Sequence, residues 1–328
     1  MLPKKPGATA AISVTKTMPD IQIAGRQLSM PSGSNLLEGL LTAGIPVPYS
    51  CRSGHCQTCL LQNHKPLAHG DPATSNLSPE QQANGWLLAC QCAVSENLEL
   101  TRFDPQQSAT PALISGQTQL AGDVLELRLQ PRGPLRYQAG QHLTLWLDDN
   151  LGRSYSIASL PDDDGLVFHL RLYPQGAFSQ RIQHMDNGQT IYLSGVAGIC
   201  HYDPDWHDRP LLLLARGTAV GMLHAIARDA LKQGHTAGIT LIVWQRSEQS
   251  GYWHAQLQAW AEQHPEVTYL TTTDNESDQL LRQTGLVARN AIALVCGSPV
   301  FVERQRKPLF MSGLARRQIL DEAFLGSQ

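Results

Sequence analysis

The chain has 328 residues, of which 42% are hydrophobic, so it is long enough for two or three domains of about 100–150 residues each. Its formal net charge is −3 and no block of like charges occurs, which argues against a nucleic-acid or lipid surface. The N-terminus has no apolar run of signal-peptide length, and the most apolar short run, 211–215, is far below the ~20 residues of a membrane helix. We therefore expect a soluble, cytoplasmic protein that does not bind membranes.

The first 104 residues predict a small mixed domain. Short alternating strands are expected at 11–14 (AISV), 21–25 (IQIAG) and 26–30 (RQLSM), followed by a helix within 35–44 (NLLEGLLTAG). Ser34 or Asn35 is the expected N-cap of that helix. A cysteine-rich loop, a turn-rich stretch and a strand at 97–103 complete the domain.

The rest of the chain predicts two further domains. A linker rich in Pro, Gln and Ser begins at residue 104, and alternating runs at short intervals over 105–208 predict an all-β antiparallel barrel. From residue 209 to 328, near-continuous apolar strands at 211–215, 239–244 and 292–296 alternate with helical segments, including a polar helix before the last of these strands. This alternation is typical of a doubly wound α/β domain with a parallel sheet.

Four of the seven cysteines fall in one pattern, C-x4-C-x2-C…C: Cys51, Cys56, Cys59 and Cys90. This spacing is typical of plant-type [2Fe–2S] sites, in which each iron needs two thiolates. Gly54 would let the loop turn with positive φ, and His55 is expected to face solvent. A structural zinc site would use two C-x2-C pairs, or one pair with paired histidines. Cys92 is the alternative fourth ligand.

Together with two later motifs, this cysteine pattern resembles the flavin-dependent reductase components of bacterial oxygenases. That family includes the reductases of naphthalene and benzoate dioxygenases and of methane and phenol monooxygenases. The later motifs are Arg153–Ser156 (RSYS) and the pair Gly217-Thr218 with Cys296–Pro299 (CGSP), in the family's order. The resemblance covers nearly all of the chain after residue 11. It implies a β-grasp-like ferredoxin domain over 1–104, an FAD-binding barrel over 105–208 and an NAD(P)-binding domain over 209–328.

The resemblance also implies contacts to FAD. Arg153 and Tyr155 should point to one side of a strand, and Ser154 and Ser156 to the other. In the family, the arginine pairs with the pyrophosphate, the tyrosine packs on the isoalloxazine and the second serine lies near its reactive nitrogen. A second element of the family contributes Arg171, Gly176, Phe178 and Ser179. In this element, main-chain amides at the start of a helix can bind phosphate. FMN is the alternative cofactor, because the sequence does not identify residues that would contact the adenine of FAD.

The nicotinamide motif departs from the family's GGTGxAP pattern. Gly217 and Thr218 match it, whereas Ala219, Gly221 and Met222 replace its glycine, alanine and proline. A methyl group at Ala219 would crowd a bound pyrophosphate, and Met222 removes a residue suited to fix the first helical turn.

Two further positions complete the implied nicotinamide site. The downstream Cys296, Gly297 and Pro299 border the nicotinamide in the family. Phe324 stands where relatives carry an aromatic residue close to the flavin. Ser156, Cys296 and Phe324 are therefore the expected catalytic residues. A buried structural cysteine and a core phenylalanine are the alternatives.

The three modules predict an NAD(P)H-dependent oxidoreductase that uses FAD and a [2Fe–2S] cluster. NADH or NADPH gives up two electrons as a hydride, whereas the cluster takes one electron at a time. A flavin can accept the pair and pass on single electrons. The expected partners are a pyridine nucleotide and a protein electron acceptor, either an oxygenase or a ferredoxin, which docks at Arg52, His55 and Gln57. One alternative is an electron carrier with a degenerate nicotinamide site, reduced by a protein partner. A zinc-stapled binding module is the other.

Overall fold

The computed structural model describes residues 18–245, 251–274 and 288–324. It divides into two compact units, one of Met1–Pro46 with Leu61–Arg102 and one of Val47–Leu60 with Phe103–Gln328. The strand expected at 11–14 lies outside the described residues. Most of the segment that is expected to form the polar helix before residue 292 lies outside them as well. Within the described part, no helix is long and apolar enough to span a bilayer.

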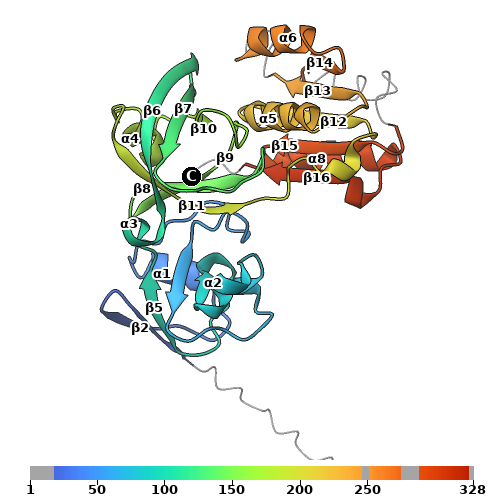
Figure 1. The fold of residues 1–328 in the computed structure, drawn as a ribbon. Helices are drawn as coiled ribbons and strands as arrows, with labels where there is room; N and C mark the ends of the chain where they lie inside the picture. The colour runs from blue at the N-terminus through green and yellow to red at the C-terminus, as the bar shows by residue number, and fades with distance from the viewer. Residues whose placement is uncertain (1–17, 246–250, 275–287, 325–328) are drawn as a thin grey trace, which may run out of the picture. The chain divides into compact units, whose positions relative to one another are not determined.

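The first unit is built on a mixed five-stranded sheet, in the order β2-β1-β5-β3-β4. Figure 1 labels β2 and β5 of this sheet. Its strands are β1 (Asp20–Ile23), β2 (Arg26–Ser29), β3 (Leu60–Asn63), β4 (Trp86–Leu88) and β5 (Leu98–Arg102). β1 is antiparallel to β2 and parallel to β5, which is antiparallel to β3. The predicted mixed α+β fold of this part is thus confirmed.

Two α-helices and two short turns of 3-10 helix accompany this sheet: α1 (Leu36–Thr42), α2 (Pro79–Ala83), η1 (Pro72–Thr74) and η2 (Ala89–Gln91). Asn35 is the N-cap of α1, because its side-chain oxygen accepts the amide of Glu38 at 3.2 Å. Of the two predicted caps, Asn35 is therefore the correct one. α1 buries its leucines at 36, 37 and 40 in the core of the unit.

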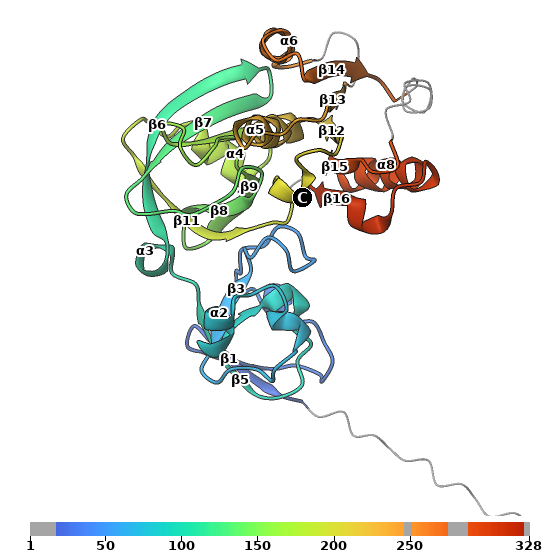
Figure 2. The same cartoon turned by 45° about the vertical axis from the view of Figure 1, so that its right-hand side comes forward.

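The second unit begins with a curved, antiparallel six-stranded sheet in the order β10-β7-β6-β11-β8-β9 (Figures 1 and 2). Its strands are β6 (Thr110–Ala121), β7 (Val124–Pro131), β8 (His142–Asp148), β9 (Leu151–Ser156), β10 (Leu166–Arg171) and β11 (Thr190–Ala197). Two short helices, α3 (Pro105–Ser108) and α4 (Ala177–Ile182), flank it. Every register given for these strands is antiparallel, as predicted.

The C-terminal part is a parallel sheet in the order β14-β13-β12-β15-β16. Its strands are β12 (Leu211–Arg216), β13 (Ile239–Trp244), β14 (Val267–Thr272), β15 (Ile292–Gly297) and β16 (Ile319–Ala323). Its helices are α5 (Ala219–Lys232), α6 (His254–Glu262) and α8 (Pro299–Met311), with 3-10 turns η3 (Pro204–Trp206) and η4 (Arg316–Gln318). The chain runs outward from β12 in one direction and then from β15 in the other. The carboxyl ends of β12 and β15 therefore form the switch point where ligands bind such sheets.

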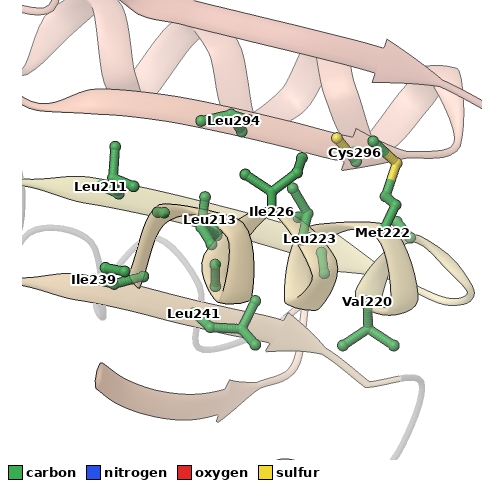
Figure 3. Packing of buried hydrophobic residues seen from close by; sticks show 14 of the residues in the cluster. Leu211, Leu213, Val220, Met222, Leu223, Ile226, Ile239, Leu241, Leu294 and Cys296 are labelled. Carbon is green, nitrogen blue, oxygen red and sulfur yellow. The ribbon is translucent and has the colours of Figure 1, made fainter. Parts of the chain in front are cut away.

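Alternating side chains of β12 supply two separate cores. Leu211 and Leu213 pack with α5, whose Leu223 and Ile226 face the sheet (Figure 3). Leu212 and Leu214 pack with residues of α8 instead. Helices thus cover both faces of the sheet, which confirms the predicted doubly wound arrangement.

Candidate functional site

The cysteine-rich loop directs main-chain donors at two sulfur atoms. The amides of Cys56 and Ser53 donate to Cys51 Sγ at 3.3 and 3.4 Å, and the amide of Cys51 donates to Cys56 Sγ at 3.4 Å. The hydrogen bond with the Cys56 thiol is the largest cause that lowers the pKa of Cys51 to about 4, against the opposing effect of burial. Sulfurs surrounded by N–H donors suit the thiolate ligands of an iron–sulfur cluster, so these residues fit the predicted group.

Three residues with positive φ shape this loop: Arg52 at 53°, Gly54 at 82° and Gln57 at 54°. The expectation for Gly54 is confirmed. For the other two, this conformation costs on the order of 1–3 kcal/mol each and must be held by surrounding contacts. The Arg52 guanidinium lies 4.5 Å from the ring centre of Tyr49, and Gln57 is only 6% exposed.

The remaining predicted ligands are Cys59 and Cys90, both buried. Cys90 lies in η2, and its carbonyl accepts a hydrogen bond from the Asn35 side chain at 2.8 Å. Cys92 is buried as well, and its carbonyl accepts the amide of Leu36 at 2.9 Å. Among the residues that the structure describes, no three His, Cys, Asp or Glu side chains form a ready-made metal site. The four-cysteine ligand set, and the choice of Cys90 over Cys92, stays a prediction.

The flavin motif lies on β9 at the edge of the six-stranded sheet, where β9 and its neighbour β8 form an antiparallel ribbon. Cross-strand pairs define the two faces of this ribbon. One face carries the pairs Leu143–Tyr155 and Leu145–Arg153, and the opposite face carries Thr144–Ser154 and His142–Ser156. The two leucines belong to the barrel core, and Tyr155 packs against that core. The predicted alternation of the RSYS side chains therefore matches the strand register.

The arginine of this motif has no carboxylate partner among the described residues. Arg153 is half-buried and donates to the carbonyl of Gly152 at 2.8 Å, and none of the ion pairs found among the described residues involves it. Tyr155 and Phe178 form an aromatic pair with ring centres 5.3 Å apart. Burial raises the pKa of Tyr155 well above its ordinary value, so its hydroxyl stays protonated.

The second predicted flavin element is the turn that leads into α4. Gly176 is the N-cap of this helix, and Ser179 is 3% exposed, with its hydroxyl accepting the amide of Tyr173 at 3.0 Å. Arg171 forms an ion pair with Asp123. A phosphate bound by Arg171 would therefore compete with that carboxylate.

Ser156 reaches from the flavin motif to the edge of the parallel sheet. Its hydroxyl donates to Glu322 Oε1 at 2.9 Å, and Glu322 on β16 stands opposite Cys296 on β15. The amide of Phe324 donates to the carbonyl of Gly297 at 2.7 Å. The three expected catalytic residues are thus linked through neighbouring positions of β15 and β16.

The nicotinamide motif occupies the carboxyl end of β12, at the switch point. Gly217 has a φ of 65°, and Thr218 is the N-cap of the 14-residue helix α5, with no capping bond from its side chain. Arg216 stands where the family pattern begins with glycine, and it donates two hydrogen bonds to Asp274, at 2.7 and 2.9 Å. On the neighbouring strand, Ser298 caps α8 and Pro299 occupies its first turn.

Two family models match the chain in this order. Residues 20–95 match the 2Fe-2S iron-sulfur cluster binding domain, and residues 111–202 match the oxidoreductase FAD-binding domain. Over 324 residues the chain is 31% identical to the ferredoxin–NAD(P)+ reductase component of the naphthalene 1,2-dioxygenase system of Pseudomonas putida, covering 93% of this chain and 97% of that protein. The chain belongs to the reductase components of aromatic dioxygenase systems. It is an oxidoreductase that moves electrons from NAD(P)H through FAD and a [2Fe–2S] cluster.

Two further relatives agree with this assignment of the reductase. Reductase component 1 of the terephthalate 1,2-dioxygenase of a Comamonas species is 30% identical, with 90% of this chain and 93% of that protein covered. The crystal structure of the Amycolatopsis cytochrome P450 reductase GcoB superposes with a TM-score of 0.63 at 25% identity, covering 94% of this chain and all of that one.

The departures of this reductase from the nicotinamide pattern have structural explanations. Ala219 and Met222 are buried members of the core between α5 and the sheet, and Met222 lies at the same end of that core as Cys296 (Figure 3). The methyl group of Ala219 packs in this core, and its crowding of a bound pyrophosphate stays a prediction. Gly221 leaves room for His169 of β10, since a Cβ on it would stand 2.6 Å from His169 Nδ1.

We expect Gly221→Ala to destabilise the reductase by about 1–2 kcal/mol. The added methyl would overlap His169, which costs roughly 1–3 kcal/mol, while alanine gains about 0.5–1 kcal/mol in helix propensity. In a His169→Ala background the overlap with the ring is removed and only a 3.1 Å approach to Ala158 Cβ remains, so the same change should cost less stability than in the wild type. Thermal unfolding of the four proteins gives the coupling energy, and additive effects would contradict this account.

The predicted catalytic cysteine is inaccessible in this structure. Cys296 is 0% exposed, and burial, followed by a hydrogen bond with Cys200, raises the pKa of its thiol well above the ordinary value. Phe324 packs in part against the core that contains Cys296. The core interpretation thus fits both residues as described, and their roles toward nicotinamide and flavin stay predictions.

The expected acceptor contact needs one correction. Arg52 and His55 are exposed, as predicted, but Gln57 is buried. It lies beside Gly195 of β11, whose φ of 67° and missing side chain leave room for it. Glu322 and the β8 residues that contact this loop carry no local signal in the sequence, because only the tertiary packing brings them to the predicted site.

Proposed function

We propose that this reductase takes hydride from NADH or NADPH at the carboxyl ends of β12 and β15. We further propose that it delivers single electrons through a cluster on Cys51, Cys56, Cys59 and Cys90 to an oxygenase component or its ferredoxin. The hydrogen bond between Ser156 and Glu322 carries the first part of the proposal. It joins the flavin motif to the strand position opposite Cys296, so that the two cofactor motifs meet at one place.

Each residue has a physical task in this proposal. Arg153 would hold the FAD diphosphate with its planar fork of donors. Glu322 fixes the Ser156 hydroxyl in one orientation. The amides that donate to Cys51 and Cys56 would stabilise the negative charge on their sulfurs. FAD, when bound, accepts two electrons as hydride and releases them singly. The chain's own work is therefore orientation rather than acid–base catalysis.

The exit of electrons is assigned to the exposed part of the cysteine loop. Arg52 and His55 offer a cationic guanidinium and an imidazole to a docking partner. A plant-type cluster has a potential of about −400 mV, which suffices to reduce a Rieske or di-iron oxygenase. The contact is expected to be small and transient, below about 1,200 Å² of buried surface.

The test is an anaerobic titration of the purified holoprotein, followed by absorption. NADH or NADPH should bleach both the flavin and the iron–sulfur bands, and dithionite in a parallel sample measures the full reducible signal. A protein that dithionite bleaches but neither nucleotide reduces would instead be the electron carrier with a degenerate nicotinamide site. Mixing the reduced protein with a Rieske oxygenase and, separately, with a plant-type ferredoxin then tests the acceptor.

A further inference from the structure

Two side chains of β8 reach the main chain of the cysteine loop. The hydroxyl of Thr144 donates to the carbonyl of Cys56 at 3.2 Å, and Nε2 of His142 lies 3.2 Å from the carbonyl of His55. Thr144 is completely buried and His142 is 7% exposed. The two residues are two positions apart on one strand, so they present one face to two successive carbonyls of the loop. All four residues belong to the same compact unit.

The neighbouring strand is shaped to admit this contact. β11 pairs with β8, with an irregular register between Ser194 and Ala197. Gly195 lies within this irregularity and Gly198 directly after it, with φ of 67° and 108°. A Cβ on Gly195 would stand 3.1 Å from Gln57 Oε1, and one on Gly198 would stand 3.0 Å from His142 Nδ1. Any side chain at either position would therefore press on the loop or on the residue that holds it.

The same face of the ribbon carries the serines of the flavin motif. Thr144 is the cross-strand partner of Ser154, and His142 is that of Ser156. On its other ring nitrogen, His142 Nδ1 lies 3.3 Å from Glu322 Oε1, the oxygen that also accepts the Ser156 hydroxyl. His142 thus touches the cysteine loop with one nitrogen and the carboxylate of the hydride-transfer site with the other.

We propose that His142 and Thr144 are positioning residues that seat the cysteine loop on the flavin-binding ribbon and so set the separation over which electrons pass between them. The inference rests on the proposed function, because it assumes a flavin at the RSYS motif and a cluster on the loop. The rate of electron transfer between two fixed groups falls exponentially with the distance between them, so a shift of the loop on the ribbon would change the rate at which the cluster is reduced. A hydroxyl that fixes the carbonyl of a ligand residue acts directly on that placement.

The test compares Thr144→Val with Thr144→Ser by anaerobic stopped-flow mixing of the holoproteins with NADH. Valine keeps the shape and removes the donor, whereas serine keeps the donor. We expect the phase in which the iron–sulfur bands bleach to slow at least 10-fold in T144V and to stay within twofold of wild type in T144S. The flavin phase should change less than twofold in both. Thr190→Val, on an exposed position of β11, is the matched control and should alter neither phase.

A second readout does not depend on turnover. The visible circular dichroism of the oxidised cluster should change in T144V and not in T144S or T190V, since it reports the geometry of the ligand loop. If T144V does not hold its cofactors, His142→Phe is compared with His142→Gln in the cluster phase alone, because glutamine retains a donor and because His142 also contacts Glu322 beside the flavin motif. Unchanged cluster phases in both T144V and H142F would overturn the inference. A wild-type protein whose flavin bleaches while its cluster does not would instead overturn the proposed function.

Discussion

A Cys90→Ser protein should purify with its flavin but without its iron–sulfur cluster. Serine cannot supply the fourth thiolate, and cluster binding is coupled to complete ligation. We expect iron and acid-labile sulfide to fall below about a tenth of the wild-type content, and delivery of electrons to a protein acceptor to fall at least ~100-fold. Reduction of the flavin by NADH should persist, because Cys90 belongs to the first unit and the flavin motif to the second.

Cys92→Ser is the matched control for this experiment. Cys92 is two positions away and equally buried, with 3% of it exposed against 8% of Cys90, so both substitutions place a hydroxyl in a buried position. The C92S protein should keep its cluster. Loss of the cluster in C92S with retention in C90S would show that Cys92 is the fourth ligand, and retention in both would refute the cysteine pattern as the ligand set.

Arg153→Ala should weaken FAD binding about 30- to 100-fold, which corresponds to about 2–3 kcal/mol for lost hydrogen bonds between charged groups. The guanidinium has no carboxylate partner among the described residues, so little else depends on it. Lysine at this position should recover only part of the affinity, because a point charge replaces a bidentate fork. Fluorescence titration of the apoprotein with FAD measures the dissociation constants.

Arg181→Ala provides the control for Arg153. Arg181 lies on α4 of the same barrel, is half exposed and forms an ion pair with Asp148, so its loss should leave FAD affinity within twofold. Equal weakening by both substitutions would mean that net charge, not a specific contact, holds the cofactor. Titration with FMN separates a contact to the shared phosphate from one to the adenosine half, and the flavin released by acid identifies which cofactor the protein carries.

Local patterns in the sequence were sufficient for the architecture. The period-two alternation of RSYS placed its side chains on the correct faces of β9, and Asn35 caps α1 as its position before the apolar run predicted. These features depend on neighbours within a few residues, where sterics and hydrogen bonding of the backbone dominate. The same holds for the buried strands of the parallel sheet.

Contacts between distant parts of the chain could not be read in this way. Ser156 and Glu322 are 166 positions apart, and His142 meets the carbonyl of His55 across 87. Gln57 is expected at the acceptor contact because it lies near Arg52 and His55 in the sequence, yet the missing side chain of Gly195 leaves room for its burial. Such pairs depend on how whole sheets pack, and a single sequence carries no local signal for them.

The hydrogen bonds that hold Val47–Leu60 to β8 bear on how reductases of this kind can be recombined. The loop is continuous in sequence with the ferredoxin fold, but the carbonyls of His55 and Cys56 accept hydrogen bonds from side chains of the barrel. A chimera joined at the predicted boundary near residue 104 would place a foreign cysteine loop against His142 and Thr144. The reverse chimera would leave the native loop without these two residues. A ferredoxin domain exchanged between relatives would therefore need His142 and Thr144 of the barrel to be exchanged with it.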